Sequence, residues 1–342
     1  MSELVSILIP AYNAERWILD TIKSAMNQSW SNKEIIVVDD GSKDSTFDIA
    51  KTFESKNIKV VRQINTGACG ARNHALRLAQ GDYIQWLDAD DLLHPDKISK
   101  QLSQVGPGRT SRTLLTCAWG KFFFRHETAK FVPDSLWQDR SAVDWILTKF
   151  KDNVWMNPSV WLVSRQLTEL AGLWDERLSS SGDDDGEYIC RVVANASNVK
   201  FVAEAQCYYR IGTVGSLNWN MEKSEKSLDL LALAMALNIA HLRSLEDSPR
   251  TRDAAMRYLQ TFLPYFYSAN EELLNKINAL AESLGGKLNP PTLGWKYRPF
   301  ELALGPLGAK RVMNNWRSMK LLAHGRWDKF LFKLDELSTI AK

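Results

Sequence analysis

The sequence lacks a long uncharged hydrophobic run, and this absence argues against a membrane-spanning segment. The longest candidate, residues 230–237, is flanked by Asp229 and Asn238, whereas a spanning helix needs about 18 or more apolar residues. The first residues also lack the basic stretch that precedes the apolar core of a secretion signal. We therefore expect a cytoplasmic protein.

Cysteine is scarce and a glycine fingerprint is missing, which excludes several kinds of site. Cys69, Cys117, Cys190 and Cys207 lie far apart with no Cys-x-x-Cys pair. Neither a zinc site nor a disulfide framework is predicted, and the thiols are expected to be reduced. No Gly-x-Gly-x-x-Gly follows the first apolar run, which excludes a dinucleotide-binding domain. The net charge of +3 is too small to predict a nucleic-acid partner.

The first hundred residues contain a regular alternation between β-type apolar runs and helical patterns. The apolar runs cover residues 5–9, 34–38, 59–61 and 83–87. Such alternation is typical of βαβ units that build a parallel sheet. We predict that the third intervening helix ends at Gly81, because glycine readily adopts the left-handed conformation found at helix ends.

The rest of the chain separates into two further parts. Residues 103–218 are irregular with short β-type runs, whereas residues 219–342 are mostly helical in pattern. We predict an α/β domain over residues 1–218, with halves 1–102 and 103–218, followed by a helical C-terminal region. The residues predicted to form the buried stripe of its first helix recur with a helical period: Leu230, Leu233, Leu237 and Ala240.

Acidic residues collect where two of the predicted strands end. Asp39 and Asp40 follow the second strand, and Asp88, Asp90 and Asp91 follow the fourth. Ligands of open parallel sheets bind at the carboxyl ends of the strands. Two carboxylates about 4 Å apart repel by roughly 4 kcal/mol at an effective dielectric of 20, so such a cluster favours a cation. An isolated Asp-x-Asp is more often a turn, but two acidic strand ends favour Mg²⁺ or Mn²⁺ bound with a phosphate.

Several motifs occur in a fixed order along the chain. The N-terminal ones are residues 5–13 (VSILIPAYN), 34–42 (EIIVVDDGS), 65–67 (NTG), 71–73 (ARN) and 81–91 (GDYIQWLDADD). Looser matches continue through residues 172–176, 183–191 and 209–210. Together they resemble the family 2 glycosyltransferases over about two thirds of the chain. Several motifs in order are far more specific than any one of them.

The resemblance implies a GT-A fold, in which helices flank a Rossmann-like, mostly parallel sheet, here with a C-terminal helical extension. It also implies that a sugar is transferred with inversion from a nucleotide-diphosphate donor to a hydroxyl acceptor, with Mg²⁺ or Mn²⁺ as cofactor. Residues 1–102 would be the nucleotide-sugar half and residues 103–218 the acceptor half. Such enzymes make polysaccharide, lipopolysaccharide or other glycoconjugates. A UDP-sugar is the favoured donor, and guanosine and thymidine donors stay open.

The resemblance also assigns residues of the donor site, by position in the matching motifs. Asp88 is expected at the ribose and the metal-diphosphate, Asp90 at the metal, and Asp91 as an assisting residue. Pro10, Tyr12 and Asp40 are expected around the nucleoside, with Asp40 facing the base, and Arg72 is also expected to line the donor pocket.

The catalytic base of the family is the Asp of a Glu-Asp pair placed six residues before an Arg. Counting back from Arg191 gives Asp185, with Asp184 in the Glu position. Because residues 183–185 are all Asp, the register stays open between Asp185 and Asp184. A positioned base contributes roughly 10²- to 10⁴-fold in rate, and the metal stabilises charge on the leaving phosphate.

Two other functions remain as alternatives. A Mg²⁺-dependent nucleotidyltransferase also uses paired carboxylates on an α/β sheet, but the Asp run favours glycosyl transfer. A non-catalytic sugar-nucleotide-binding protein is the second alternative, against which the complete motifs argue. Four tryptophans stand in the acceptor half, where aromatic faces suit sugar rings, but core packing is favoured for each: Trp119, Trp155, Trp161 and Trp174.

The C-terminal tail is basic and aromatic. Residues 290–342 hold ten Lys and Arg against four Asp and Glu. Two interpretations stay open for residues 292–333. The segment lies on the inner face of a membrane, near a lipid-linked or saccharide acceptor, or it is a helix packed on the catalytic domain with its basic side chains in water.

Overall fold

The computed structural model describes residues 2–105, 112–179, 181–212, 224–267, 270–290, 316, 319 and 323–335. Within these residues, nine strands form one sheet in the order β3–β2–β1–β4–β8–β6–β9–β5, and β7 pairs with β6. The strands are β1 (Val5–Ala11), β2 (Lys33–Asp39), β3 (Ile58–Arg62), β4 (Tyr83–Trp86), β5 (Leu92–Leu93), β6 (Thr113–Phe122), β7 (Lys130–Phe131), β8 (Leu162–Ser164) and β9 (Asn198–Arg210).

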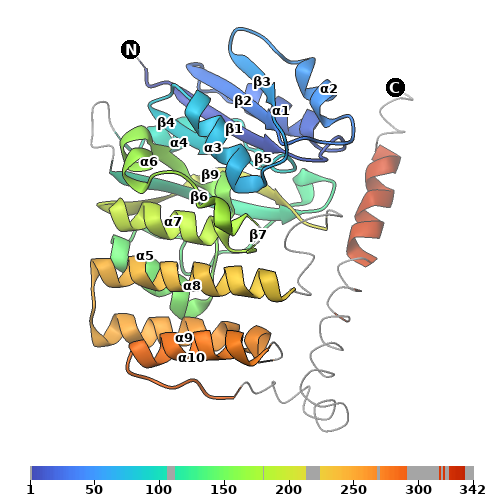
Figure 1. Ribbon diagram of the computed structural model, residues 1–342. Helices are drawn as coiled ribbons and strands as arrows, with labels where there is room; N and C mark the ends of the chain where they lie inside the picture. The colour runs from blue at the N-terminus through green and yellow to red at the C-terminus, as the bar shows by residue number, and fades with distance from the viewer. Residues whose placement is uncertain are drawn as a thin grey trace.

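Helices cover the sheet and continue beyond it (Figure 1). Those of the sheet region are α1 (Ile18–Met26), α2 (Thr46–Lys51), α3 (Ala68–Leu78), α4 (Lys97–Leu102), α5 (Ala142–Asp152), α6 (Arg165–Ala171) and α7 (Asp184–Asn195), with short 3₁₀ turns η1 (His126–Thr128), η2 (Pro158–Val160) and η3 (Glu176–Leu178). The C-terminal helices are α8 (Glu225–Leu245), α9 (Pro249–Phe266) and α10 (Glu271–Ser283). Residues 323–335 are also helical.

The N-terminal half contains the parallel sheet that the sequence predicts. β1 pairs in parallel with β2 and β4, and β2 pairs in parallel with β3. β1 and β2 are largely apolar and buried on both faces, as crossover helices require. Ala11 lies opposite Asp39 at the ends of β1 and β2, so the segments that follow these strands begin side by side.

The second half of the sheet is mixed. β8 runs antiparallel to β4 and β6, whereas β6 and β9 are parallel. β5 and β7 add short antiparallel edges. The hydrogen-bonded pair of β4 and β8 joins the two halves of the sheet. Residues from both halves are therefore held in fixed positions relative to one another.

The C-terminal helices pack on α5 and α7 (Figure 1). Phe150 of α5 stacks on Tyr258 of α9, with ring centroids 4.2 Å apart and planes 7° apart. By length and composition, α8 is the one helix among the described residues that could span a membrane. In this fold α8 packs against α7, α9 and α10.

The buried stripe predicted for α8 is wrong. The side chains that α8 buries most deeply include Leu231, Met235, Ile239 and Leu242, and Ala240 is exposed. Because α8 is apolar on nearly every face, its period alone does not select the face that packs against α7.

The predicted helix end at Gly81 is also wrong. α3 ends at Leu78, and its C-cap Ala79 is extended with φ of −69°. Gly81 lies farther on, against β1, where an added Cβ would approach the backbone N of Ser6 to 2.5 Å. The glycine therefore permits close backbone packing and does not cap the helix. All four cysteines are free and buried.

Candidate active site

A cavity of about 430 Å³ lies at the carboxyl ends of β1, β2 and β4, facing the N-terminus of α7. The residues predicted from sequence that line it are Pro10, Tyr12, Asp40, Arg72, Asp88, Asp90, Asp184 and Asp185. Asp91 does not line it. The acidic ends of the second and fourth strands thus meet in one cavity, as the order of the strands in the sheet requires.

Asp40 holds the loop between β3 and α3. Its carboxylate accepts hydrogen bonds from the backbone N of Thr66 and of Gly67, each at 2.9 Å, and from Gln63 Nε2 at 2.7 Å. Gly67 takes φ of +86° just before α3, a conformation that favours glycine. Asp40 is only 3% exposed and forms the inner wall of the cavity beside Tyr12.

Arg72 of α3 bridges two carboxylates from different parts of the chain. Its Nη1 lies 2.7 Å from Asp184 Oδ2, and its Nη2 lies 3.0 Å from Asp88 Oδ1. The guanidinium also lies 4.3 Å from the centroid of the Trp174 ring. Burial disfavours its charge, but Asp88 and Asp184 together raise the pKa of Arg72. The carboxylate of Asp184 is therefore already neutralised by a buried cation.

Asp185 has a different environment from its neighbour. Its Oδ1 accepts a hydrogen bond from the backbone N of Gly186 at 2.8 Å. Burial, and then the charges of Asp184 and Asp183, raise the pKa of Asp185 to about 7, against the opposing effect of Arg72 and Lys149. A carboxyl with this pKa exchanges a proton near neutral pH, as a general base requires.

The first turn of α7 is held by the C-terminal helices. Asp183 precedes α7, and its Oδ2 accepts hydrogen bonds from Asn238 Nδ2 of α8 and from the Tyr258 hydroxyl of α9, each at 3.0 Å. Lys149 of α5 adds positive charge, and its own pKa is raised by Asp183 although burial opposes this. The helical extension therefore sets the position of the acidic run.

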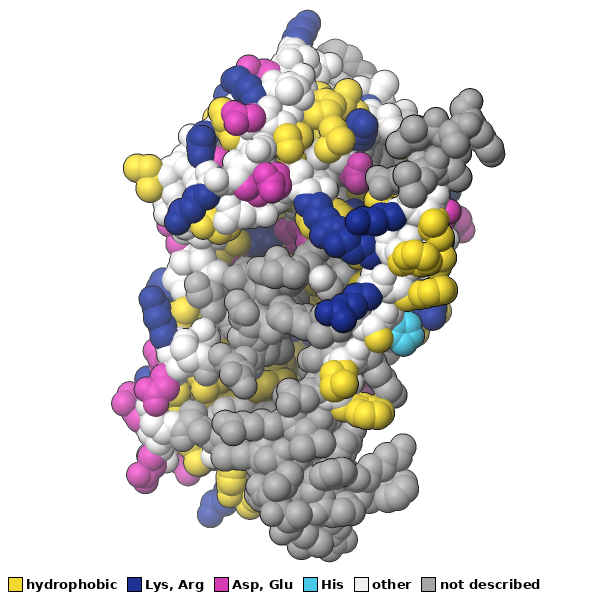
Figure 2. All heavy atoms as spheres, turned by 90° about the vertical axis from the view of Figure 1, so that its right-hand side faces the viewer, with side chains coloured by type: hydrophobic (Ala, Val, Ile, Leu, Met, Phe, Trp, Pro, Cys, Tyr) yellow, Lys and Arg dark blue, Asp and Glu magenta, His cyan; other side chains and the backbone are white. Residues whose placement is uncertain are grey.

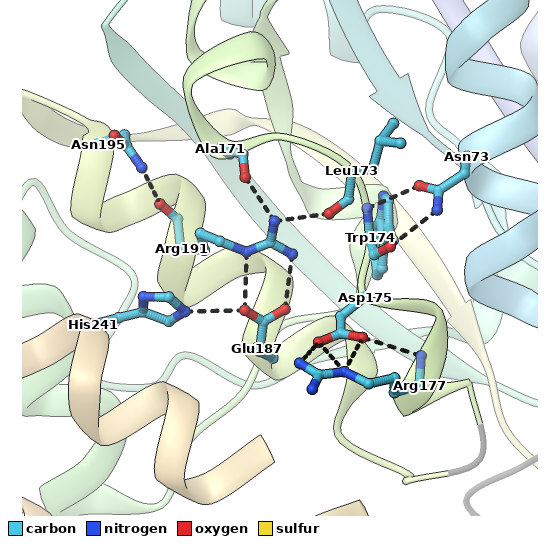
Figure 3. Close-up of polar contacts among 10 residues, drawn as sticks. All are labelled: Asn73, Ala171, Leu173, Trp174, Asp175, Arg177, Glu187, Arg191, Asn195 and His241. Atoms are coloured by element: carbon cyan, nitrogen blue, oxygen red, sulfur yellow. Dashed lines mark hydrogen bonds and ion pairs between the residues drawn. The ribbon is translucent and has the colours of Figure 1, made fainter. Parts of the chain in front are cut away.

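A second network fixes the next turn of α7 (Figure 3). Glu187 is 2% exposed, and its carboxylate accepts from Arg191 Nε and Nη2 and contacts His241 Nε2, all at 2.9 Å. Arg191 also donates to the carbonyl oxygens of Ala171 and Leu173. Despite burial, His241 and Arg191 lower the pKa of Glu187. In the sequence motif Arg191 marks the position of the base, six residues before it. In the structure Arg191 anchors α7 outside the cavity.

The three acidic residues after β4 differ in exposure and partners. Asp88 and Asp90 line the cavity, whereas Asp91 is fully buried and accepts from the backbone N of Arg210 at 2.9 Å and from Ser159 Oγ at 3.1 Å. Burial, with Asp90 and Asp88, raises the pKa of Asp91 well above its usual value. Asp91 therefore ties β9 and η2 to the cavity floor.

Among the described residues, no group of three or more Asp, Glu, His or Cys side chains could hold a metal by itself. Asp88 and Asp90, two of the carboxylates that line the cavity, still suit Mg²⁺ or Mn²⁺. These hard ions take oxygen ligands, and they complete their coordination with water and substrate phosphates.

Sequence reasoning missed several lining residues, of which Arg210 is the most notable. Arg210 is 3% exposed, donates from Nε to the carbonyl oxygen of Asp90 at 2.8 Å, and lies 4.0 Å from the Trp17 ring centroid. Burial lowers its pKa to about 10, although Asp90 and Asp91 oppose this. The motif at residues 209–210 was the signal that could have identified it. Arg210 therefore adds a second cation, besides Arg72, to the cavity lining.

The four tryptophans of the acceptor half divide into two groups. Trp161, Trp174 and Trp119 are 0%, 2% and 7% exposed, as core packing predicts. Trp155 is 37% exposed and lines the cavity, so the prediction of core packing is wrong for this residue. Trp155 follows the end of α5, where Asn153 takes the left-handed conformation.

Comparison with known proteins agrees with this geometry. Residues 6–120 match the sequence model of the family described as Glycosyl transferase family 2. The chain is 31% identical to an uncharacterized glycosyltransferase of Rickettsia typhi, over 54% of this chain and 57% of that protein. It is 48% identical to the Escherichia coli UDP-Glc:alpha-D-GlcNAc-diphosphoundecaprenol beta-1,3-glucosyltransferase WfaP, over 29% of this chain and 40% of that protein. The chain thus spans about two fifths to three fifths of the length of these relatives.

Solved structures share the fold. The Staphylococcus aureus TarS fragment 1–349 in complex with UDP gives a TM-score of 0.63 at 17% identity, over 82% of both chains. The mannosyltransferase PcManGT of Pyrobaculum calidifontis, in complex with GDP-Man and Mn²⁺, gives a TM-score of 0.53 at 17% identity, over 95% of this chain and 83% of that one. The fold is GT-A, and residues 6–120 match the family 2 glycosyltransferase model. The resemblance found in the motifs is confirmed.

Proposed function

We propose that this protein is an inverting, metal-dependent glycosyltransferase that moves a sugar from a nucleotide-diphosphate donor to a hydroxyl acceptor. One observation carries the proposal. A single cavity is lined on one side by Asp88 and Asp90 and on another by Asp185, the carboxyl with a pKa of about 7. Direct displacement needs a cation-supported leaving group and a base within one site.

The nucleoside end of the donor occupies the part of the cavity formed by Pro10, Tyr12 and Asp40. Tyr12 is 48% exposed and offers an aromatic face to a base. UDP is the favoured nucleotide, because WfaP is named for UDP-Glc and the TarS structure contains UDP. The GDP-Man complex of PcManGT keeps a guanosine donor as the alternative.

The diphosphate lies between Asp90 and Arg210. Asp88 and Asp90 would hold Mg²⁺ or Mn²⁺, which supplies Lewis-acid stabilisation of the leaving phosphate when bound. Arg210 adds a fixed, largely buried positive charge, and Arg72 keeps Asp88 in place through its ion pair. The charges of Asp88, Arg210 and Arg72 are therefore in place before the donor binds.

Asp185 removes the proton from the acceptor hydroxyl as that oxygen attacks the sugar. The ion pair with Arg72 makes Asp184 the weaker candidate, which supports Asp185 in the register left open by the sequence. The acceptor is a saccharide or a lipid-linked glycan in polysaccharide, lipopolysaccharide or other glycoconjugate synthesis. The relatives support this class, as the WfaP name gives a diphosphoundecaprenol acceptor and Bacillus subtilis TuaG is named for teichuronic acid biosynthesis.

The experiment measures nucleotide release from UDP-sugars by Asp185→Asn and Asp184→Asn proteins with Mn²⁺. Asp185→Asn is expected to lower turnover by about 10²- to 10⁴-fold while UDP binding, followed by thermal shift, is kept. Asp184→Asn is expected to cost about tenfold, because it weakens the contact that positions Arg72. Near-normal turnover in Asp185→Asn would refute the assignment of the base. Release of pyrophosphate from nucleoside triphosphates would favour the nucleotidyltransferase alternative.

Peripheral membrane contact is the second part of the proposal, and the exposed face of the C-terminal helix supports it. Of residues 292–333, only 316, 319 and 323–333 lie within the described residues. Trp327, Phe330 and Leu334 recur at helical spacing and are 63%, 52% and 46% exposed. Figure 2 shows hydrophobic side chains gathered near Lys and Arg side chains on this side of the molecule.

The opposite face of the same helix is docked on the catalytic domain. Asp328 Oδ2 accepts from the backbone N of Phe124 at 2.9 Å, and its Oδ1 accepts from Arg125 Nε at 2.8 Å. The two interpretations of the tail are therefore compatible, since the helix packs on the domain and presents its aromatic stripe outward. With the flanking basic residues Arg326 and Lys333 exposed, the surface suits an anionic bilayer.

Co-sedimentation of the full chain with phosphatidylglycerol vesicles tests the membrane contact. The double variant Trp327→Ser, Phe330→Ser is expected to bind about tenfold more weakly, because roughly 1.4 kcal/mol of apolar burial is lost. The matched control, Ile64→Ser with Leu170→Ser, removes exposed apolar residues elsewhere and is expected to bind like the wild type. Equal, weak binding of all three proteins would end the membrane proposal.

A further inference from the structure

A second cavity, of about 310 Å³, adjoins the catalytic cavity and shares Trp155 with it. Trp119 and Lys121 of β6 line it, together with Lys130 of β7 and Asp134. These residue types combine a flat apolar surface with both signs of charge. None of these four residues lines the catalytic cavity.

Two lysines meet in this cavity, and Asp134 is the one acidic residue in the described part of its lining. Lys121 and Lys130 lie opposite each other in the antiparallel pair of β6 and β7, and like charges directly opposite each other destabilise a sheet. Among the described residues, neither lysine forms an ion pair within 4.0 Å. Burial lowers the pKa of Lys121, and Asp134 only partly opposes this. A bound anion would relieve the repulsion between the two lysines.

The lysine head group is held by indole rings. Lys121 Nζ lies 5.1 Å from the centroid of the Trp119 ring and 5.5 Å from that of Trp155. The two rings are 5.0 Å apart. Trp155 is 37% exposed, so part of this large ring is left for a ligand. An exposed indole beside hydrogen-bonding groups suits the apolar face and the hydroxyls of a sugar.

The same aromatic cluster connects the two cavities. Tyr209 lines the catalytic cavity and meets the Trp155 ring edge-on, with centroids 5.3 Å apart. Trp155 itself borders both cavities. A ligand packed on Trp155 in the second cavity therefore lies next to the cavity that contains Asp185.

We propose that this second cavity binds an anionic saccharide, as the acceptor of the transfer reaction. Lys121 and Lys130 hold its carboxylate or phosphate, its ring packs on Trp155, and Asp134 accepts a hydrogen bond from a hydroxyl. The inference rests on the proposed function, because it names the class of acceptor for that reaction. To the proposed function, the inference adds a preference for an acidic acceptor over a neutral one.

Saturation-transfer difference NMR titrations of the full chain test this preference with three probes. Methyl β-D-glucuronide carries a carboxylate, methyl β-D-glucoside 6-phosphate carries a phosphate, and methyl β-D-glucoside is neutral. At low salt, at least one anionic probe is expected to bind about tenfold more tightly than the neutral probe. The tighter of the two anionic probes identifies the acidic group.

Variants locate the binding. Lys121→Gln is expected to remove the preference for the anionic probe, and Trp155→Ala to weaken all three probes. Trp155→Phe, which keeps an aromatic ring, is expected to retain binding and so controls for misfolding. Lys151→Gln changes an exposed lysine of α5 outside the cavity and is expected to match the wild type.

Three results would overturn the proposal: equal affinity for neutral and anionic probes, no effect of Lys121→Gln, or displacement of the sugar phosphate by an equal concentration of inorganic phosphate. The last result would mean a plain anion site. Binding of UDP with Mn²⁺ is measured on the same samples. If UDP binding and Asp185-dependent turnover persist while the saccharide preference is absent, the acceptor assignment fails and the proposed function stands.

Discussion

Asp185 and Asp184 are neighbours in the sequence, yet they occupy opposite electrostatic environments. Arg72 neutralises Asp184, whereas burial and two adjacent carboxylates raise the pKa of Asp185 to about 7. The two environments differ because, in the first turn of α7, Asp184 points toward α3 and pairs with Arg72. Identical side chains in a row carry no sequence signal for that choice.

The raised pKa predicts how Asp185 affects stability. Between pH about 4 and 7 the folded chain keeps a proton on Asp185 that the unfolded chain has lost, so stability falls as pH rises through this window. Asp185→Asn removes the cost of the buried charge. In the absence of ligands, its Tm at pH 8 is expected to exceed that of the wild type by about 2–6 °C, and the gain should vanish only below about pH 4.

Calorimetry at the two pH values checks this prediction. Asp184→Asn is the control, because it breaks the pair with Arg72 and is expected to lower Tm at both pH values. A lower Tm for Asp185→Asn at pH 8 would contradict the stated environment. The raised pKa of Asp185 also predicts that kcat/KM of the wild type rises with pH and levels off above about pH 7.

At the scale of elements, α7 connects the site to its support. The helix begins with the acidic run, and one turn later Glu187 meets Arg191 and His241 in a buried network (Figure 3). The position of Asp185 thus depends on contacts with α8 and with the segment after α6. The sequence motif identifies Arg191 by its spacing, but only the fold assigns it an anchoring role.

Glu187→Gln is expected to lower the free energy of unfolding by about 3 kcal/mol, because Arg191 loses its buried anionic partner. The pKa of Glu187 is lowered, so its contribution is present above pH about 4.5 and is lost as pH falls through its folded pKa. Urea denaturation at pH 7 and pH 4 measures both effects. Glu169→Gln, an exposed change on α6, should leave stability within about 0.5 kcal/mol. An unchanged midpoint for Glu187→Gln would contradict the network.

At the scale of the whole molecule, the catalytic domain and the C-terminal helices share one core. A continuous cluster of buried residues includes Ile7 of β1, Trp145 of α5, Leu231 of α8 and Leu259 of α9. The sequence predicts a boundary near residue 218, but the helices beyond it hold Asp183 through Asn238 and Tyr258. The extension therefore packs into the same core as the sheet and helps to position the acidic run.

This shared core predicts one cooperative unfolding transition for the described parts of the chain. UDP with Mn²⁺ at 100 times its Kd should stabilise the folded state by about 2.7 kcal/mol. Near-UV and far-UV circular dichroism should shift together, because the helical extension unfolds with the domain that binds the ligand. Two transitions, of which only one responds to UDP, would show that the extension is independent.

The sequence by itself determined the first four strands, the acidic strand ends and the resemblance to the family 2 glycosyltransferases, because apolar runs and ordered motifs are local patterns. Tertiary structure decided the buried face of α8, the place of Gly81 beside Ser6 and the burial of Asp91. It also decided the exposure of Trp155 and the pairing of Arg72 with Asp184. These features depend on contacts between segments that lie far apart in the chain, and local periodicity carries no information about them.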